Sequence, residues 1–287
     1  MFPVPVSFCF DFGSCGDAMR RYAMHEFAVN GAKHLVFTDF LFRKCLGDAN
    51  LAAALLKEMA AEGLTFVDSH APCQGKYDPI YPDPACRRQM ILRMKLCLNI
   101  CAEVGVDTFT VHIGNDFPYP DIPLETHLGN IRGALDEILP EAERCGVTVC
   151  MENIWVRSNV SPVLIALKKE YPTDFLGLCY DSGHANLMEK GKAYKDNAVT
   201  GLWPEAVWQE HILEDMLPDV VNCHLHDNSG QYDEHLLPGR GNIDWPHIMG
   251  LLKRAPRLKN IQSEVSAVGG LNSIRDLVRT FDGLMTA

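Results

Sequence analysis

The chain has 287 residues, of which 47% are hydrophobic and 22% are charged, and its formal net charge is −11 at pH 7. These proportions are typical of one globular domain with a sizeable core, and no apolar run approaches the ~20 residues that span a bilayer. The 37 acidic residues outnumber the 26 basic ones, which disfavours a nucleic-acid-binding protein, because such proteins concentrate Lys and Arg against the phosphates.

Apolar, strand-like runs alternate with helical stretches along the whole chain. In chain order we predict strand 4–10 and helix 17–30, strand 33–38 and helix 48–62, strand 64–70 and helix 84–104, strand 107–112 and helix 123–145, strand 147–152 and helix 161–171, strand 175–181 and a longer helical region ending near 217, strand 220–224 and helix 245–253, and strand 258–264 and helix 273–285.

Eight strand–helix units of this kind predict a single-domain (β/α)8 TIM barrel over residues 1–287. The strands are continuous apolar runs without polar alternation, as expected for parallel strands that are buried on both faces. A doubly wound open sheet is the alternative fold, but no Gly-rich turn follows the first strand to hold a dinucleotide.

Histidines and carboxylates lie where the predicted strands end, which in such barrels is the face that carries the active site. They are His70, His112, Glu152, Asp181, His224 and Glu264, with His184 three residues beyond Asp181. Carboxylate oxygens combined with imidazole nitrogens suit Mn²⁺, Zn²⁺, Co²⁺ or Fe²⁺, whereas an all-oxygen site favours Mg²⁺ or Ca²⁺. We therefore predict a metal centre, with Glu152, Asp181, His224 and Glu264 from four successive strands as its first ligands.

Five motifs occur in order along the chain: Met151-Glu152-Asn153, Asp181-Ser-Gly-His184, His224-Leu-His-Asp227, Pro238-Gly-Arg-Gly-Asn-Ile-Asp-Trp245 and Ser263-Glu264. Together they resemble the xylose isomerase-like TIM-barrel superfamily, and most closely its sugar (phosphate) isomerase/epimerase branch.

The resemblance implies that Glu152, Asp181, His224 and Glu264 bind the metal and that the two glutamates form the acid/base pair. It also implies that His184 contacts a substrate oxygen. We place His70, His112 and Arg240 in substrate binding, while His226 is left open between a structural and a functional role. The implied cofactor is Mn²⁺ or Zn²⁺, with Co²⁺ and Mg²⁺ as alternatives.

Zinc-dependent apurinic endonucleases of the same superfamily hold three zinc ions, and this chain resembles that pattern too. His70, His112 and His184 match its additional histidines, and Asp233-Glu-His235 resembles its Asp-x-His pair. Asp233 and His235 are therefore candidates for a second metal ion or for substrate binding. The number of ions stays open at this point.

Four functions remain. We favour a metal-dependent isomerase or epimerase of a sugar or sugar derivative, which transfers a proton through a metal-stabilised enediolate. The alternatives are a lyase or dehydratase at the same site, a zinc phosphodiesterase acting on abasic DNA, and a non-catalytic binding protein. The expected partner is a small carbohydrate, with no nucleic acid and no membrane, and a homo-oligomer is compatible with the resemblance.

The compartment is suggested by the N-terminus and by the eleven cysteines. The N-terminus lacks the basic and apolar segments of a signal peptide. The cysteines form no Cys-x-x-Cys pair and fall largely within apolar patterns, as buried reduced thiols do. We therefore expect a cytoplasmic protein.

Overall fold

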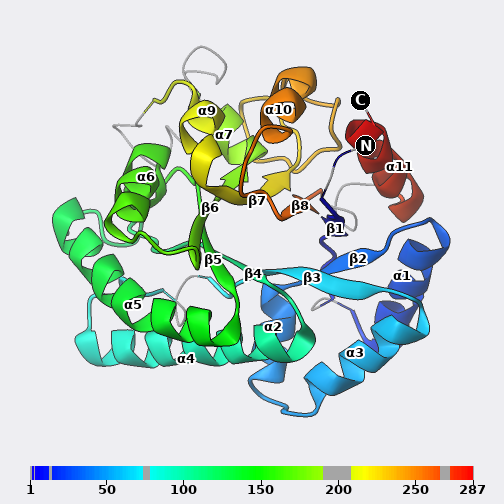
Figure 1. The fold of residues 1–287 in the computed structure, drawn as a ribbon, viewed down its shortest axis with the longest axis horizontal. Helices are drawn as coiled ribbons and strands as arrows, with labels where there is room; N and C mark the ends of the chain where they lie inside the picture. The colour runs from blue at the N-terminus through cyan, green and yellow to red at the C-terminus, as the bar shows by residue number, and fades with distance from the viewer. Residues whose placement is uncertain are drawn as a thin grey trace.

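The structure, a computed structural model, describes residues 2, 4–12, 15–73, 78–189, 208–265 and 272–286. Its centre is a closed barrel of parallel strands in the order β1 to β8, and helices surround the barrel (Figure 1). Pairing of Val6 in β1 with Ile261 in β8 closes the ring. The predicted (β/α)8 barrel is confirmed, and the open-sheet alternative is wrong.

The strands are short and lie close to their predicted positions. They are β1 Val6–Phe8, β2 His34–Phe37, β3 Thr65–His70, β4 Thr108–Val111, β5 Thr148–Glu152, β6 Leu176–Asp181, β7 Val220–Leu225 and β8 Asn260–Ser263.

The described helices fill the intervals between the strands. They are α1 Asp17–Val29, α2 Asp39–Cys45, α3 Leu51–Ala61, α4 Pro84–Val104, α5 Leu124–Cys145, α6 Ser161–Glu170, α7 Ser182–Met188, α9 Ile212–Met216, α10 Trp245–Leu252 and α11 Ile274–Thr286, with 3-10 turns η2 Arg157–Asn159 and η3 Leu217–Asp219. None of these helices is long and apolar enough to cross a membrane.

Two differences from the predicted elements concern short helices. The seven-residue helix α2 was not predicted, because two turns are too short to show a helical period, and its Phe42 packs against Phe37 and Phe109. In place of one longer helical region ending near 217, the described chain has α7 and α9, while residues 190–207 lie outside the described ranges.

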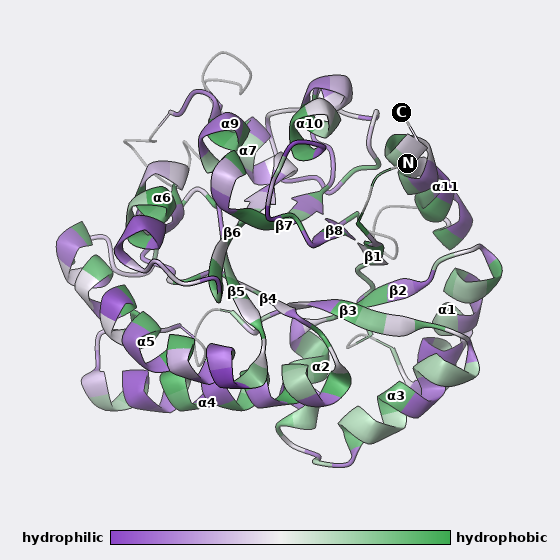
Figure 2. Cartoon of the chain, viewed as in Figure 1, coloured by the Kyte–Doolittle hydropathy of each residue, from purple (hydrophilic) through white to green (hydrophobic). Residues whose placement is uncertain are grey.

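The main core lies between the barrel and its helices. One hydrophobic cluster joins strand residues such as Val149 and Leu178 to helix residues such as Leu135 and Leu164. In Figure 2 the helices alternate between hydrophilic and hydrophobic segments. This pattern follows from geometry, since a helix at the edge of a barrel buries only one stripe.

A second, polar layer fills part of the barrel interior. The fully buried Asp68 carboxylate accepts hydrogen bonds from the Thr108 hydroxyl (2.9 Å) and from the Asn222 side-chain amide (3.0 Å). The same amide also donates to the Thr110 hydroxyl (3.0 Å). Strands β3, β4 and β7 are thereby tied together, and a buried network that satisfies its members fixes one arrangement of the strands.

Candidate metal centre

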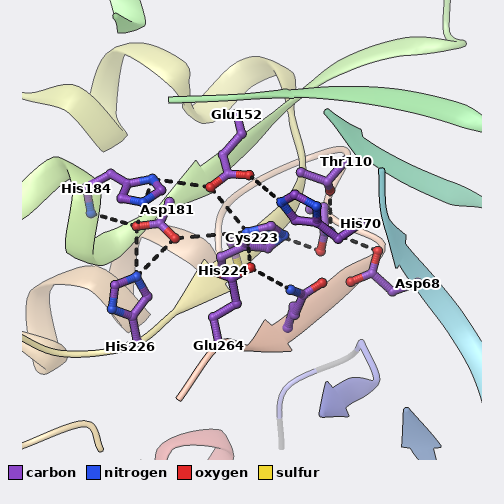
Figure 3. Close-up of polar contacts among 12 residues, drawn as sticks. Asp68, His70, Thr110, Glu152, Asp181, His184, Cys223, His224, His226 and Glu264 are labelled. Carbon is purple, nitrogen blue, oxygen red and sulfur yellow. Dashed lines mark hydrogen bonds and ion pairs between the residues drawn. The ribbon is translucent and has the colours of Figure 1, made fainter. Parts of the chain in front are cut away.

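The residues that the sequence places at strand ends converge on one region at the mouth of the barrel (Figure 3). His70, Glu152 and Asp181 are the last residues of β3, β5 and β6, and His224 is the penultimate residue of β7. His112 and Glu264 directly follow β4 and β8.

The Glu152 carboxylate is the hub of this cluster and is fully buried. Its Oε1 lies 3.2 Å from His184 Nδ1 and 3.4 Å from His224 Nδ1. Its Oε2 lies 3.2 Å from His112 Nε2 and 3.4 Å from His70 Nε2. Four imidazoles from different segments therefore surround one carboxylate.

His224 meets carboxylates from three strands. Its Nδ1 lies 3.2 Å from Glu264 Oε1, 3.4 Å from Glu152 Oε1 and 3.9 Å from Asp181 Oδ2. A single nitrogen cannot satisfy three carboxylates by hydrogen bonding, so these atoms are arranged around a shared point.

Unpaired buried atoms provide a test of whether this set suits a metal ion. Among the described residues, both carboxylate oxygens of Glu152 and both ring nitrogens of His224 are buried without a hydrogen-bond partner. Such orphaned polar atoms are costly unless something else binds them. Carboxylate oxygens together with an imidazole nitrogen in this state fit a divalent cation of the Mn²⁺ or Zn²⁺ type.

The electrostatics of the cluster also favour a cation. Burial opposes the charged form of His224, but Glu264 and Glu152 outweigh it and raise the pKa of His224 to about 9. By the same balance, Glu152 raises the pKa of His70 to about 10 and that of His112 to about 9. Although burial opposes ionisation of Glu152, the histidines around it hold its pKa well below its usual value. Protons or a metal ion must supply the positive charge here.

Three of the histidines are oriented by backbone carbonyls, which can only accept a hydrogen bond. Nδ1 of His70 donates to the Ala71 carbonyl (2.9 Å), Nδ1 of His184 to that of Asn153 (3.0 Å) and Nδ1 of His235 to that of Glu264 (2.7 Å). In the neutral ring this leaves the lone pair on Nε2, as is common for metal-binding histidines.

A further group lies next to Asp181, on the side of the cluster away from His70. His184 Nε2 lies 3.5 Å from Asp233 Oδ2, and His235 Nε2 lies 3.1 Å from the same oxygen. Burial opposes ionisation of Asp233, but His184 and His235 outweigh it and lower its pKa. The structure thus brings Asp233 and His235 together with His184, which is the arrangement that the sequence left undecided.

His226, whose role the sequence left open, lies inside this group. Its Nε2 is 3.2 Å from both oxygens of Asp181, and its ring stacks on that of His235 with centroids 3.9 Å apart. A Cβ atom on Gly183 would lie 2.0 Å from Cε1 of His226, so only glycine leaves room for this ring. The His-x-His spacing of His224 and His226 is the sequence signal that could have indicated this position.

Local structure around Asp181 explains how the cluster is held. The Asp181 side chain caps helix α7 by accepting a hydrogen bond from the backbone N–H of His184 (2.6 Å), which fixes His184 in the first turn. The side chain of Asn153 pairs with the Asp181 backbone, accepting from its N–H (2.8 Å) and donating to its carbonyl (3.1 Å). One aspartate therefore positions a neighbouring histidine as well as facing the cluster.

The loop between β7 and α10 carries Asp233 and His235 and is anchored by Asp227. Its fully buried carboxylate accepts hydrogen bonds from the Gly239 N–H (2.8 Å) and the Trp245 indole (2.9 Å). Arg240 on the same loop is exposed, and its predicted role in substrate binding stays a prediction.

Two cysteines, Cys73 and Cys179, lie next to the cluster. All eleven cysteines of the chain are free. Cys179 lies close to Glu152 and His224, but burial and the nearby Glu152 raise its pKa well above the usual value, so it stays a thiol. Burial also opposes ionisation of Cys73, but its hydrogen bond with His112 outweighs burial and lowers the pKa of this thiol.

Comparison with known proteins gives a family match. The sequence model of the family described as "Xylose isomerase-like TIM barrel" matches residues 26–261. Among curated proteins, the uncharacterized protein y4fM of Sinorhizobium fredii is 27% identical over 167 residues, covering 56% of this chain and 48% of that protein. The uncharacterized protein MJ1311 of Methanocaldococcus jannaschii is 28% identical over 130 residues, covering 44% and 39%. The chain thus spans about half of these relatives or less.

Solved structures with the same fold cover nearly the whole chain. A D-tagatose 3-epimerase-like protein is 20% identical with a TM-score of 0.72, covering 98% of this chain and 96% of its own. D-psicose 3-epimerase from Clostridium cellulolyticum H10 is 14% identical with a TM-score of 0.73, covering 99% of each chain. The 3-keto-D-glucoside 4-epimerase YcjR from E. coli is 12% identical with a TM-score of 0.73, covering 99% and 100%.

Proposed function

This chain belongs to the xylose isomerase-like TIM-barrel family, and on that premise we propose that it is a divalent-metal-dependent isomerase or epimerase of a sugar or sugar derivative. The single observation that carries the proposal is the approach of Glu152 Oε1 and Glu264 Oε1 to the same His224 nitrogen, at 3.4 and 3.2 Å. The named activities of several solved relatives, which are sugar epimerases, agree with it.

In this proposal Glu152, Asp181, His224 and Glu264 hold the ion, which is Mn²⁺ or Zn²⁺, with Co²⁺ or Mg²⁺ as alternatives. When bound, a divalent ion supplies Lewis acidity, which polarises a substrate carbonyl and stabilises an enediolate. The remaining chemistry, which is the transfer of a proton next to that carbonyl, is assigned to side chains of this chain.

Glu152 and Glu264 are the proposed acid/base pair. They come from β5 and the end of β8, so they reach His224 from different sides of the barrel. The depressed pKa of Glu152 keeps it ionised, as a base that removes a proton requires. The Oε1 of Glu264 accepts a hydrogen bond from the Gln262 side-chain amide (3.0 Å), which orients it. One glutamate removes the proton and the other returns it.

His184, His70 and His112 are the proposed contacts to substrate oxygens. His184 is buried, whereas His70 and His112 are partly accessible and their Nε2 atoms face Glu152 Oε2 at 3.4 and 3.2 Å. An imidazole whose Nδ1 is held by a carbonyl can accept from a substrate hydroxyl through Nε2, or donate to an oxyanion once protonated.

The test is Glu→Gln substitution with solvent-deuterium exchange into the sugar as the readout. We expect Glu152→Gln and Glu264→Gln each to slow exchange about 10²–10⁴-fold, the usual contribution of general acid–base catalysis. Glu214→Gln, on α9 away from the cluster, is the matched control. Metal content is measured for every variant, and undiminished exchange in either cluster variant would rule out its acid/base role.

A lyase or dehydratase is the alternative within the same chemistry, because an enediolate can also expel a β-leaving group. Analysis of the product separates it from an isomerase: loss of water or of another group gives a product of lower mass, whereas an isomer or epimer has the mass of the substrate.

A second candidate function is a zinc-dependent phosphodiesterase, favoured by the three neighbouring ligand groups. These are His70, His112 and Glu152; Glu152, Asp181, His224 and Glu264; and His184, His226, Asp233 and His235. Three zinc ions per chain together with cleavage of an abasic duplex would establish this function. The excess of 37 acidic over 26 basic residues speaks against a DNA substrate.

A further inference from the structure

A cavity of about 150 Å³ adjoins the metal centre at His112. It is lined by the loops after β3, β4 and β5, and its walls include Asp78, Asn115, Phe117 and Trp155. The Trp155 ring stands edge-on to His184, with centroids 4.9 Å apart, so the cavity begins where the proposed substrate contacts end. A single water needs ~10–15 Å³ on a comparable measure, so the space suits several atoms of a ligand.

Asp78 gives this cavity its chemical character. The residue is 4% exposed, and its Oδ1 accepts hydrogen bonds from the backbone N–H groups of Ile80 (3.1 Å) and Asn115 (3.4 Å). Its Oδ2 accepts no hydrogen bond from the described residues. This oxygen is also not one of the fully buried polar atoms that lack a partner, so it is accessible. Oδ2 is therefore available to accept a hydrogen bond from a ligand in the cavity.

The loop that carries Asn115 is fixed in place by an ion pair between Asp116 and Arg157. Asp116, in the loop after β4, contacts Arg157 Nε at 2.6 Å and accepts hydrogen bonds from the Ser158 N–H (3.2 Å) and hydroxyl (3.0 Å). The Asn159 side chain donates to the Gly114 carbonyl, which ties the same loop to η2. The Arg157 guanidinium is thus bound to a buried acid, and Arg157 is not among the described residues that line the cavity.

We propose that this cavity binds the uncharged, hydroxyl-bearing end of the sugar substrate and that Asp78 accepts a hydrogen bond from one of its hydroxyl groups. The inference rests on the proposed sugar isomerase or epimerase function, and it narrows the substrate class to sugars without a phosphate or carboxylate at that end.

Charge and geometry together support this choice. Among the residues that the structure describes, no Lys or Arg lines the cavity, whereas Asp78 does. Burial raises the pKa of Asp78 to about 6, so the group is a carboxylate at neutral pH. A buried carboxylate repels a phosphate group, while it accepts from a hydroxyl through a charge-assisted hydrogen bond. The indole of Trp155 offers an apolar face to the carbon atoms of a sugar.

The test compares free sugars with their phosphates on the metal-loaded full chain. The probes are D-tagatose and D-fructose with the corresponding 6-phosphates, in wild type, Asp78→Asn and Asp121→Asn. Asp121 is exposed on the same loop as Asn115 and does not line the cavity, so it is the matched control. Binding is followed by calorimetry, turnover by solvent-deuterium exchange, and folding by thermal denaturation.

We expect the wild type and Asp121→Asn to bind the free sugars at least tenfold more tightly than the phosphates. Asp78→Asn should raise KM for the free sugars about tenfold, as a lost hydrogen bond to a charged group does, with kcat little changed. Tighter binding of the 6-phosphates, or a KM in Asp78→Asn equal to the control, would overturn the inference while exchange continues. If no sugar exchanges deuterium with metal present, the proposed function fails and the inference fails with it.

Discussion

Metal loading of the chelator-treated protein should release protons. In the metal-free cluster, carboxylates outweigh burial and raise the pKa of His224 to about 9, of His70 to about 10 and of His112 to about 9. Because these values lie above the usual histidine pKa of 6.5, the protonated rings stabilise the metal-free fold fully below about pH 6.5. That contribution is lost as pH rises through about 9 to 10.

A histidine that binds a metal ion must be neutral, so the ion displaces its proton. Each displaced proton makes the dissociation constant fall about tenfold per pH unit, or about 1.4 kcal/mol, in this window. One ion bound through His224 alone therefore predicts about hundredfold tighter binding at pH 8.5 than at pH 6.5. If ions also bind His70, His112, His184 and His235, the dissociation constant would fall more steeply with rising pH.

Isothermal titration in two buffers of different ionisation enthalpy counts the protons directly, and elemental analysis of the loaded protein counts the ions. The His247→Gln variant is the control, since that ring pairs with Glu214 at 2.9 Å on the outer helices. It should leave the proton count unchanged. A dissociation constant that does not vary with pH, with no proton released, would refute the inference that the metal ion displaces protons from these histidines.

Three further outcomes are expected. Gly183→Ala should destabilise the protein by about 1–3 kcal/mol in urea unfolding and weaken metal binding, because its Cβ would lie 2.0 Å from the His226 ring. The control is Gly129→Ala, inside α5, where nothing lies within 4 Å of the added Cβ. This variant should be neutral or stabilising in the same assay. Asp78→Asn should be more stable than wild type at pH 7.5 by up to about 2–3 kcal/mol, because burial raises the pKa of Asp78 to about 6. Since a raised carboxyl pKa means stability lost as pH rises through that value, this difference should vanish near pH 4, and a constant difference would contradict the assignment. A chelator should lower the midpoint of thermal unfolding, since metal at about 100 times its dissociation constant adds about 2.7 kcal/mol; an unchanged midpoint would mean that the fold binds no metal.

The sequence was sufficient to predict the order of the strands in the barrel and the residues at which the strands end. Buried parallel strands appear as continuous apolar runs, and helices appear through their period, so both are encoded by residues close together in the chain. Once a barrel is inferred, all strand ends must meet on one face. For this reason His70, Glu152, Asp181 and His224 could be placed at one mouth before their distances were known.

Only the tertiary structure decided which atoms meet within that mouth. His226 lies against Asp181 because Gly183 leaves room for its ring, although Asp181 and His226 are 45 residues apart in the chain. The sequence did not indicate Asp78 or the cavity beside it, because the neighbouring Asn115 follows another strand, 37 residues later.

The division between the two sources of information has a physical cause. Secondary structure and strand order depend on local backbone geometry and on the spacing of apolar residues, which a sequence displays directly. The distances among Glu152, His224 and Glu264 instead depend on how strands from distant parts of the chain twist and pack around one another. The chain by itself therefore determined the barrel and the types of side chain at its mouth, while packing decided which of these side chains lie together.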